Sequence, residues 1–189
     1  KLRRALTQEE FILHYQPQFD LATRQLTGVE ALVRWQRTSD EFTLPGLFIA
    51  ESERSGVIHE LGQHVFLEAC RQLARWLESG VDVPRVSVNV SARQLRKNDF
   101  VERVAETLEK TGVPPGRMEI EVTESVLLDP SPEVKTVIAR LKALGLKLCL
   151  DDFGTGYSSI TSLRQFPFDT LKIDRGFVAG MLDNAADQA

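Results

Sequence analysis

Apolar residues follow two patterns that alternate along the chain: short continuous runs, and longer stretches in which they recur at helical spacing. The short runs predict six strands, over 11–19, 26–35, 86–90, 118–122, 146–150 and 170–173. The helical spacing predicts three long helices between these strands, each ending at a glycine: Gly80, Gly112 and Gly145. A Gly-rich loop and a short helix follow the fifth strand, and a final helix begins near Phe177.

Strands that alternate with helices indicate βαβ units and a parallel sheet, either open and doubly wound or closed into a (β/α)8 barrel. An open sheet that binds dinucleotides carries Gly-x-Gly-x-x-Gly after its first strand, and no such motif is present. The pattern therefore favours the TIM-type barrel. Six strands do not fill that barrel, which typically takes roughly 250 residues, so we expect this chain to lack its last one or two β/α units.

Composition and charge narrow the class of protein. With 42% hydrophobic and 26% charged residues the chain is globular, and its net charge of −4 disfavours binding to polymeric nucleic acid. No apolar run approaches about 18 residues, so we expect no membrane contact by this domain. Cys70 and Cys149 lie among apolar residues, which suits a reduced, cytoplasmic setting, although the parent protein could be membrane-anchored. We expect one domain over 1–189, with 1–8 as the end of an upstream linker.

Polar residues stand where the predicted strands end: Asn89, Glu121, Asp151, Asp152, Lys172 and Asp174, with Glu30 inside the second strand. In a barrel these ends face one mouth, which is where the active site is found. Carboxylates that meet there repel one another unless cations neutralise them. Because the donors are all oxygens, with no cysteine and no suitably spaced histidine, we expect Mg²⁺ or Mn²⁺ rather than zinc.

Two adjacent aspartates cannot both face one site from a regular strand, so the strand must turn at Asp151 and Asp152, with Gly154 and Gly156 supplying the freedom. One aspartate bridging two cations would suit in-line displacement at phosphorus. Each residue also has a plain structural interpretation, as a helix cap, a turn residue or a surface lysine. Asp152-Phe153-Gly154 also imitates a kinase motif, but its companion motifs are absent.

A signature and five further motifs resemble the EAL domains, which are bacterial phosphodiesterases acting on cyclic di-GMP. The signature is Glu30-Ala31-Leu32, followed by Val33-Arg34-Trp35. The other matches are Tyr15-Gln16-Pro17, the segment Val88 to Leu95, Glu119 to Ser125, Asp151 to Ser159, and Lys172-Ile173-Asp174. So many motifs in one order are far more specific than a single short pattern.

The resemblance implies a modified (β/α)8 barrel whose first strand is antiparallel to the rest, and two divalent cations. Glu30, Asn89, Glu121 and Asp151 would bind the first cation, and Asp151 and Asp152 would share the second. Lys172 matches the lysine assigned as base or water-orienting group, and we expect it to be catalytic with Glu30 and Asp151. The implied substrate contacts are Gln16, Leu32, Arg34 and Asp174, and Glu124 would fix the Asp-Asp-Phe-Gly loop, which connects to a dimer interface.

By resemblance the function is metal-dependent hydrolysis of cyclic di-GMP to linear pGpG, with nearby cations lowering the pKa of Lys172 so that a neutral amine accepts a proton. The alternative is an inactive EAL domain that binds cyclic di-GMP as a receptor. An enolase-type barrel lyase is a weaker third interpretation. Family members carry a further glutamate on the seventh strand and a glutamine near the eighth, and neither occurs in these 189 residues, so the activity of this chain stays open. A homodimer, and fusion to a sensor or GGDEF domain, are expected partners.

Overall fold

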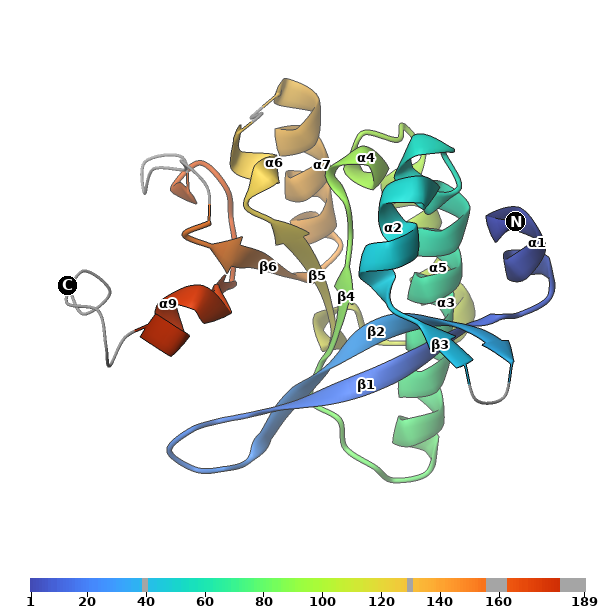
Figure 1. Cartoon of the computed structure of the whole chain (residues 1–189). Coiled ribbons are helices and arrows are strands. Elements are labelled where there is room, and N and C mark those ends of the chain that lie inside the picture. The colour runs from blue at the N-terminus through green and yellow to red at the C-terminus, as the bar shows by residue number, and fades with distance from the viewer. Residues whose placement is uncertain (39–40, 129–130, 156–162, 181–189) are drawn as a thin grey trace.

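One mixed β-sheet organises the molecule (Figure 1), a computed structural model that describes residues 1–38, 41–128, 131–155 and 163–180. Neighbouring strands follow the order β1-β2-β4-β5-β6-β7, and β3 pairs with β2. The strands are β1 (Phe11–Phe19), β2 (Leu26–Thr38), β3 (Glu41–Thr43), β4 (Val86–Asn89), β5 (Met118–Thr123), β6 (Lys147–Phe153) and β7 (Thr170–Ile173).

The direction of the strands is that of the expected modified barrel. Strand β1 pairs with β2 in antiparallel register, with Gln16 opposite Glu30, whereas β2, β4, β5, β6 and β7 are parallel neighbours. Parallel neighbours bring their carboxyl ends to the same edge, so the residues that end β4, β5, β6 and β7 share one end of the sheet. The predicted fold class, α/β with an antiparallel first strand, is confirmed.

Helices connect the parallel strands. They are α1 (Leu2–Thr7), α2 (Pro45–Arg54), α3 (Ile58–Glu78), α4 (Ala92–Leu95), α5 (Phe100–Thr111), η1 (Pro115–Arg117), α6 (Ser125–Leu128), α7 (Pro132–Ala143) and α9 (Arg175–Gly180). Helix α3 contacts β1, β2 and β4 and packs on α5, which contacts α7 (Figure 1). Its buried residues Leu61, Val65, Ala69 and Leu73 follow the helical spacing that predicted it.

Strand β5 shows how the sheet separates the core from the candidate site. Met118, Ile120 and Val122 are buried in the hydrophobic core. Because side chains alternate along a strand, Glu119 and Glu121 point to the opposite face. Both glutamates are nevertheless completely buried. The sheet therefore has an apolar face under the helices and a polar face toward the barrel interior.

The structure also adds elements that the apolar pattern did not predict: α1, β3, α2, α4, η1 and α6. Most are too short to repeat a pattern, and α2 begins with Pro45 at its first position. Residues 1–8 were predicted to end a linker; Leu2 and Ala5 of α1 are buried against the domain. The strand predicted over 146–150 in fact runs from Lys147 to Phe153. The short helix expected after the Gly-rich loop, and the end of the last helix, fall outside the described residues.

Within the described part of the chain, no helix combines the length and apolar character needed to cross a membrane.

Candidate active site

Side chains from four strands meet around the ammonium group of Lys172. On β7, Lys172 Nζ donates to Glu30 Oε2 of β2 at 2.8 Å and to Glu121 Oε2 of β5 at 2.5 Å. Asn89 Nδ2, at the end of β4, donates to Glu30 Oε1 at 2.8 Å. Four of the predicted site residues are thus brought within hydrogen-bond contact, although Glu30 and Lys172 are 142 residues apart in the chain.

Glu121 is the most deeply buried member of this cluster. Its residue is fully buried, and among the described residues Oε1 has no hydrogen-bond partner. Burial raises the pKa of its carboxyl to about 7, against the opposing effect of Lys172, and the charges of Glu30 and Asp151 raise it further. A buried oxygen without a partner is costly unless something binds it, and a divalent cation fits both the oxygen and the surrounding negative charge.

Asp151 and Asp152 lie where β6 turns. Asp152 has a positive φ of 56°, and its backbone N–H donates to Asp151 Oδ1 at 2.9 Å. Aspartate tolerates this left-handed conformation better than most residues. The expected turn is therefore present, but the freedom for it comes from Asp152 and from Gly154, whose φ is 103°. Gly156, which we expected to contribute, lies outside the described residues.

The pKa values of the acidic groups near this turn reflect their crowding. Burial raises the pKa of Asp152, and the neighbouring carboxylates of Asp151 and Asp174 raise it further, while Lys172 opposes them. Asp174 follows β7, and its Oδ1 accepts a hydrogen bond from the Gly176 N–H at 2.7 Å. Three aspartates thus lie beside the Lys172 cluster with more negative charge than one ammonium can balance.

Glu124 contacts the turn after β6 from the other side. Its side chain is buried, and Oε2 accepts a hydrogen bond from the backbone N–H of Gly154 at 3.0 Å. Its own N–H donates to the Asp151 carbonyl oxygen at 3.1 Å. Two hydrogen bonds therefore connect Glu124 to the segment carrying Asp151 and Asp152, a geometry that suits the expected role in positioning this loop.

The protonation of Lys172 follows from its surroundings. Burial alone would lower its pKa, but the facing carboxylates of Glu121 and Glu30 raise it by more, so the pKa lies above its ordinary value. In this arrangement Lys172 is an ammonium ion. The sequence predicts a neutral Lys172 because bound cations would lower its pKa. Without cations, the carboxylates of Glu121 and Glu30 raise that pKa instead.

Three of the expected substrate contacts, Gln16, Leu32 and Arg34, lie on β1 and β2, and the fourth, Asp174, follows β7. Gln16 is exposed and opposite Glu30, and Arg34 Nη1 donates to the carbonyl oxygen of Val33 at 3.0 Å. A cavity of about 620 Å³ opens next to the cluster. Its lining includes Leu32, Asn89, Ala92, Arg93 and Thr123. Asn89 belongs to both the cavity and the cluster, whereas Glu30, Glu121 and Lys172 are not among the residues that line the cavity.

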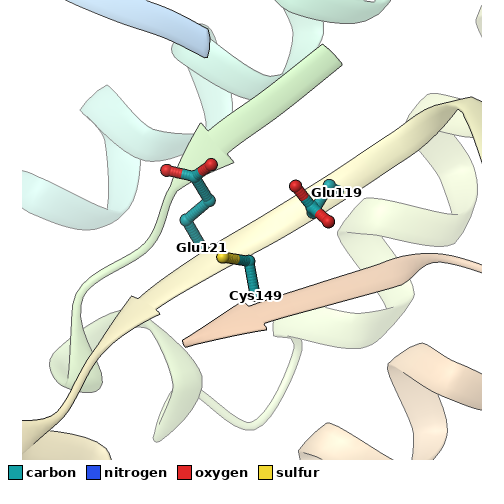
Figure 2. A group of neighbouring side chains, drawn as sticks. All are labelled: Glu119, Glu121 and Cys149. Carbon is teal, nitrogen blue, oxygen red and sulfur yellow. The ribbon is translucent and has the colours of Figure 1, made fainter. Parts of the chain in front are cut away.

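Sequence reasoning missed Glu119, which lies deeper in the barrel. Glu119, Glu121 and Cys149 approach one another closely, with one ligand-type atom from each within 4.8 Å of the others (Figure 2). The signal was available, because Glu119 precedes Glu121 by two positions and so shares its face of the strand. Both cysteines are buried and free, as their apolar neighbours predicted. His64 Nε2 lies 3.1 Å from the Phe11 carbonyl oxygen.

Comparison with known proteins identifies the family of the chain. The EAL domain model matches residues 1–189. The chain is 41% identical over 177 residues to the signaling protein YkoW of Bacillus subtilis, covering 94% of this chain and 22% of YkoW. It is 37% identical over 188 residues to the bifunctional diguanylate cyclase/cyclic di-GMP phosphodiesterase MucR of Pseudomonas aeruginosa, covering 100% of this chain and 27% of MucR. The chain thus spans about a quarter of the length of these curated relatives.

A solved structure described as the PaMucR phosphodiesterase in complex with c-di-GMP superimposes with a TM-score of 0.92 and 36% identity. The match covers 99% of this chain and 76% of that chain. The family model, the relatives and the fold all agree with the family that the motifs resemble. The chain belongs to the EAL domain family.

Proposed function

We propose that this domain hydrolyses cyclic di-GMP to linear pGpG in a reaction that depends on divalent cations. The observation that carries the proposal is Glu121, a fully buried carboxylate with an unpartnered oxygen among the described residues, in contact with Lys172 and near Glu30. Such a group is expensive to bury for structural reasons alone, and perturbed carboxylates gathered at one mouth are typical of catalytic sites.

The residues that would hold the cations are Glu30, Asn89, Glu121, Asp151 and Asp152. Their oxygens are the ligands that Mg²⁺ and Mn²⁺ prefer. The residues come from four neighbouring strands, β2, β4, β5 and β6. Bound there, two divalent cations would supply Lewis acidity, lowering the pKa of water and neutralising phosphoryl oxygens. The turn at Asp152, which is held by hydrogen bonds to Glu124, would direct the side chains of Asp151 and Asp152 toward the same cation site.

The remaining residues would bind and orient the substrate. Leu32 and Asn89 line the 620 Å³ cavity beside the cluster, which falls within the size range of small-molecule sites. Arg34 could give a phosphate two parallel hydrogen bonds, after release from the carbonyl of Val33. Gln16, Leu32, Arg34 and Asp174 are the proposed contacts. Lys172, as an ammonium, would hold the attacking water by donating a hydrogen bond to its oxygen.

The test is turnover of cyclic di-GMP with Mg²⁺ or Mn²⁺, with the product identified chromatographically. We expect pGpG from the wild-type chain and a loss of at least about a hundredfold in kcat/KM in Glu30→Gln and Asp151→Asn. Glu106→Gln is a matched control, since Glu106 is a solvent-exposed carboxylate on α5 that is bonded only weakly to Lys110. Equal rates in the site variants and the control would refute the assignment.

A receptor without hydrolysis is the second candidate, and one observation favours it. Lys172 already lies between Glu30 and Glu121, so part of the negative charge is balanced by the chain itself. A site neutralised in this way could bind a cyclic dinucleotide without cutting it. Calorimetry of cyclic di-GMP with Ca²⁺, followed by product analysis with Mg²⁺, distinguishes binding from hydrolysis. We further propose a cytoplasmic homodimer that belongs to a longer signalling protein with a sensor or GGDEF domain, because the curated relatives are about four times longer.

A further inference from the structure

A second polar network lies deeper in the barrel, beneath the Lys172 cluster, and its centre is Glu119 (Figure 2). Glu119 Oε1 accepts a hydrogen bond from Ser87 Oγ at 2.8 Å, and Oε2 accepts one from Thr170 Oγ1 at 3.0 Å. Arg85 forms an ion pair with the same carboxylate, with Nε 3.1 Å from Oε1. Unlike Glu121, Glu119 therefore has both oxygens occupied by protein groups, which makes it a poor cation ligand.

The partner on β7 is the informative one. Thr170 is the first residue of β7 and precedes Lys172 by two positions, so both side chains face the barrel interior. In the described structure β7 is four residues long and pairs with β6, with an irregular register between Leu150 and Phe153. The hydrogen bond from Thr170 to Glu119 passes over β6 and connects β7 to β5.

A strand of four residues with an irregular register has few backbone hydrogen bonds to fix its position, and a slip of one residue would send every side chain to the other face. Here such a slip would move the Lys172 side chain away from Glu121 and Glu30. It would also turn the side chain of Leu171, which is now partly exposed, into the polar interior. Loss of the Thr170 hydroxyl would remove the interior contact that opposes this movement. The hydrogen bond between Thr170 and Glu119 can oppose the slip because Glu119 is itself held in place. Glu119 is fully buried and contacts Ser87 and Arg85.

We propose that Glu119 and Thr170 are positioning residues, which hold β7 so that the Lys172 ammonium reaches Glu121 and Glu30. Neither residue touches the reacting groups in this proposal. Arg85 compensates the buried charge of Glu119, and it also donates through Nη2 to Gln18 Oε1 of β1 at 3.1 Å. The network thus connects the first strand of the sheet to the last described one beneath the site.

The test compares Thr170→Val, which removes the hydroxyl but keeps the branched shape, with Thr170→Ser, which keeps the hydroxyl. Thr27→Val is the matched control, because Thr27 is an exposed strand residue whose hydroxyl donates to the Gln18 carbonyl oxygen. The first readout is acetylation of Lys172 by acetic anhydride in EDTA, followed by mass spectrometry, with the exposed Lys97 and Lys110 as internal references. We expect acetylation of Lys172 to rise about fivefold or more in Thr170→Val and to stay near wild type in Thr170→Ser and Thr27→Val, as its buried contacts are lost only in the first.

The second readout rests on the proposed function. We expect kcat for cyclic di-GMP to fall about tenfold in Thr170→Val with KM within about twofold, and Thr170→Ser to restore most of it. Unchanged acetylation of Lys172 in a folded Thr170→Val protein would overturn the inference, whatever the activity. A wild-type chain without turnover would count against the proposed function instead, and acetylation alone would then decide whether Thr170 positions Lys172.

Discussion

Asp169 and Leu148 exchange two hydrogen bonds across the entrance to β7. The backbone N–H of Asp169 donates to the Leu148 carbonyl oxygen at 2.8 Å, and the N–H of Leu148 donates to Asp169 Oδ2 at 2.8 Å. Lys142 Nζ, on α7, lies 2.7 Å from the other carboxylate oxygen. Asp169 therefore fastens β7 to β6 and α7 from outside the barrel, while Thr170 is held from inside.

The carboxylate of Asp169 should make stability depend on pH. Burial opposes its ionisation, but the hydrogen bonds from Lys142 and the Leu148 amide outweigh burial and hold its pKa below the ordinary 3.8. A lowered pKa in the folded state stabilises the protein above 3.8, and this contribution disappears as the pH falls through the folded-state pKa. We expect Asp169→Asn to reduce the free energy of unfolding by about 1 kcal/mol at neutral pH, a modest value because solvent screens the pair.

Urea denaturation at neutral and acid pH measures this effect. The difference between wild type and Asp169→Asn should shrink below pH 3.8 and then vanish, because the protonated wild-type carboxyl resembles the amide. Asp82→Asn is the control, since Asp82 is largely exposed and pairs with Arg117. A difference that does not vary with pH would mean that the charge of Asp169 has no part in its contribution.

Gly154 should tolerate no side chain. Its φ of 103° disfavours any L-residue, and a Cβ there would approach Phe177 Cε2 to 2.5 Å. We expect Gly154→Ala to destabilise the protein by about 2 kcal/mol, measured by chemical denaturation. In a Phe177→Ala background the cost should fall but not disappear, because the overlap is relieved and the φ is not. Gly46→Ala, in α2 with open space around it, should be neutral or slightly stabilising. Equal costs at the two glycines would contradict the argument.

Cations should stabilise the fold through the Glu30–Glu121–Asp151 region. A ligand that binds only the folded state raises the free energy of unfolding by about 2.7 kcal/mol at a hundred times its dissociation constant. We expect Mg²⁺ or Mn²⁺ to raise the melting temperature relative to EDTA, and Asp151→Asn to abolish most of this rise. Glu106→Gln should respond as wild type does. A rise of the same size in Asp151→Asn would place the cation elsewhere.

The Cys70 thiol should be unreactive while the protein is folded. Burial raises its pKa to about 12, so at about pH 8 the thiolate fraction is on the order of 10⁻⁴. Iodoacetamide should therefore modify Cys70 slowly in buffer and rapidly in guanidinium chloride, as peptide mass spectrometry can follow. Rapid modification under native conditions would show that α3 opens locally around Cys70.

The sequence could predict the alternation of strands and long helices because each long element repeats its apolar pattern several times. The reversed direction of β1 could not be read in this way, since an apolar strand has the same pattern in both directions, and it entered only through the family resemblance. The Asp151–Asp152 pair predicted a turn, but the backbone conformation that makes it is adopted by Asp152 itself.

The candidate site was predicted as a set of strand-end residues, and the structure adds how they contact one another. Lys172 bonds to Glu30 and Glu121 because strands far apart in the sequence place these residues at the same level along the sheet. Residue types alone do not specify that alignment. The network around Glu119 was missed for a related reason. Ser87, Arg85 and Thr170 are unremarkable in sequence, and their role becomes visible only where the folded sheet brings them to one carboxylate.

The reversal of β1 decides where the polypeptide enters the domain. Phe11, at the start of β1, pairs with Trp35 beyond the signature on β2, and Glu10 binds both the indole N–H of Trp35 at 2.7 Å and the backbone N–H of Gln36 at 2.7 Å. A first strand parallel to the others would begin at the end of the sheet opposite the candidate site. Because β1 is antiparallel, it begins at the end of the sheet where the parallel strands finish. Helix α1 therefore leads directly into the contacts with β2, the strand that bears Glu30.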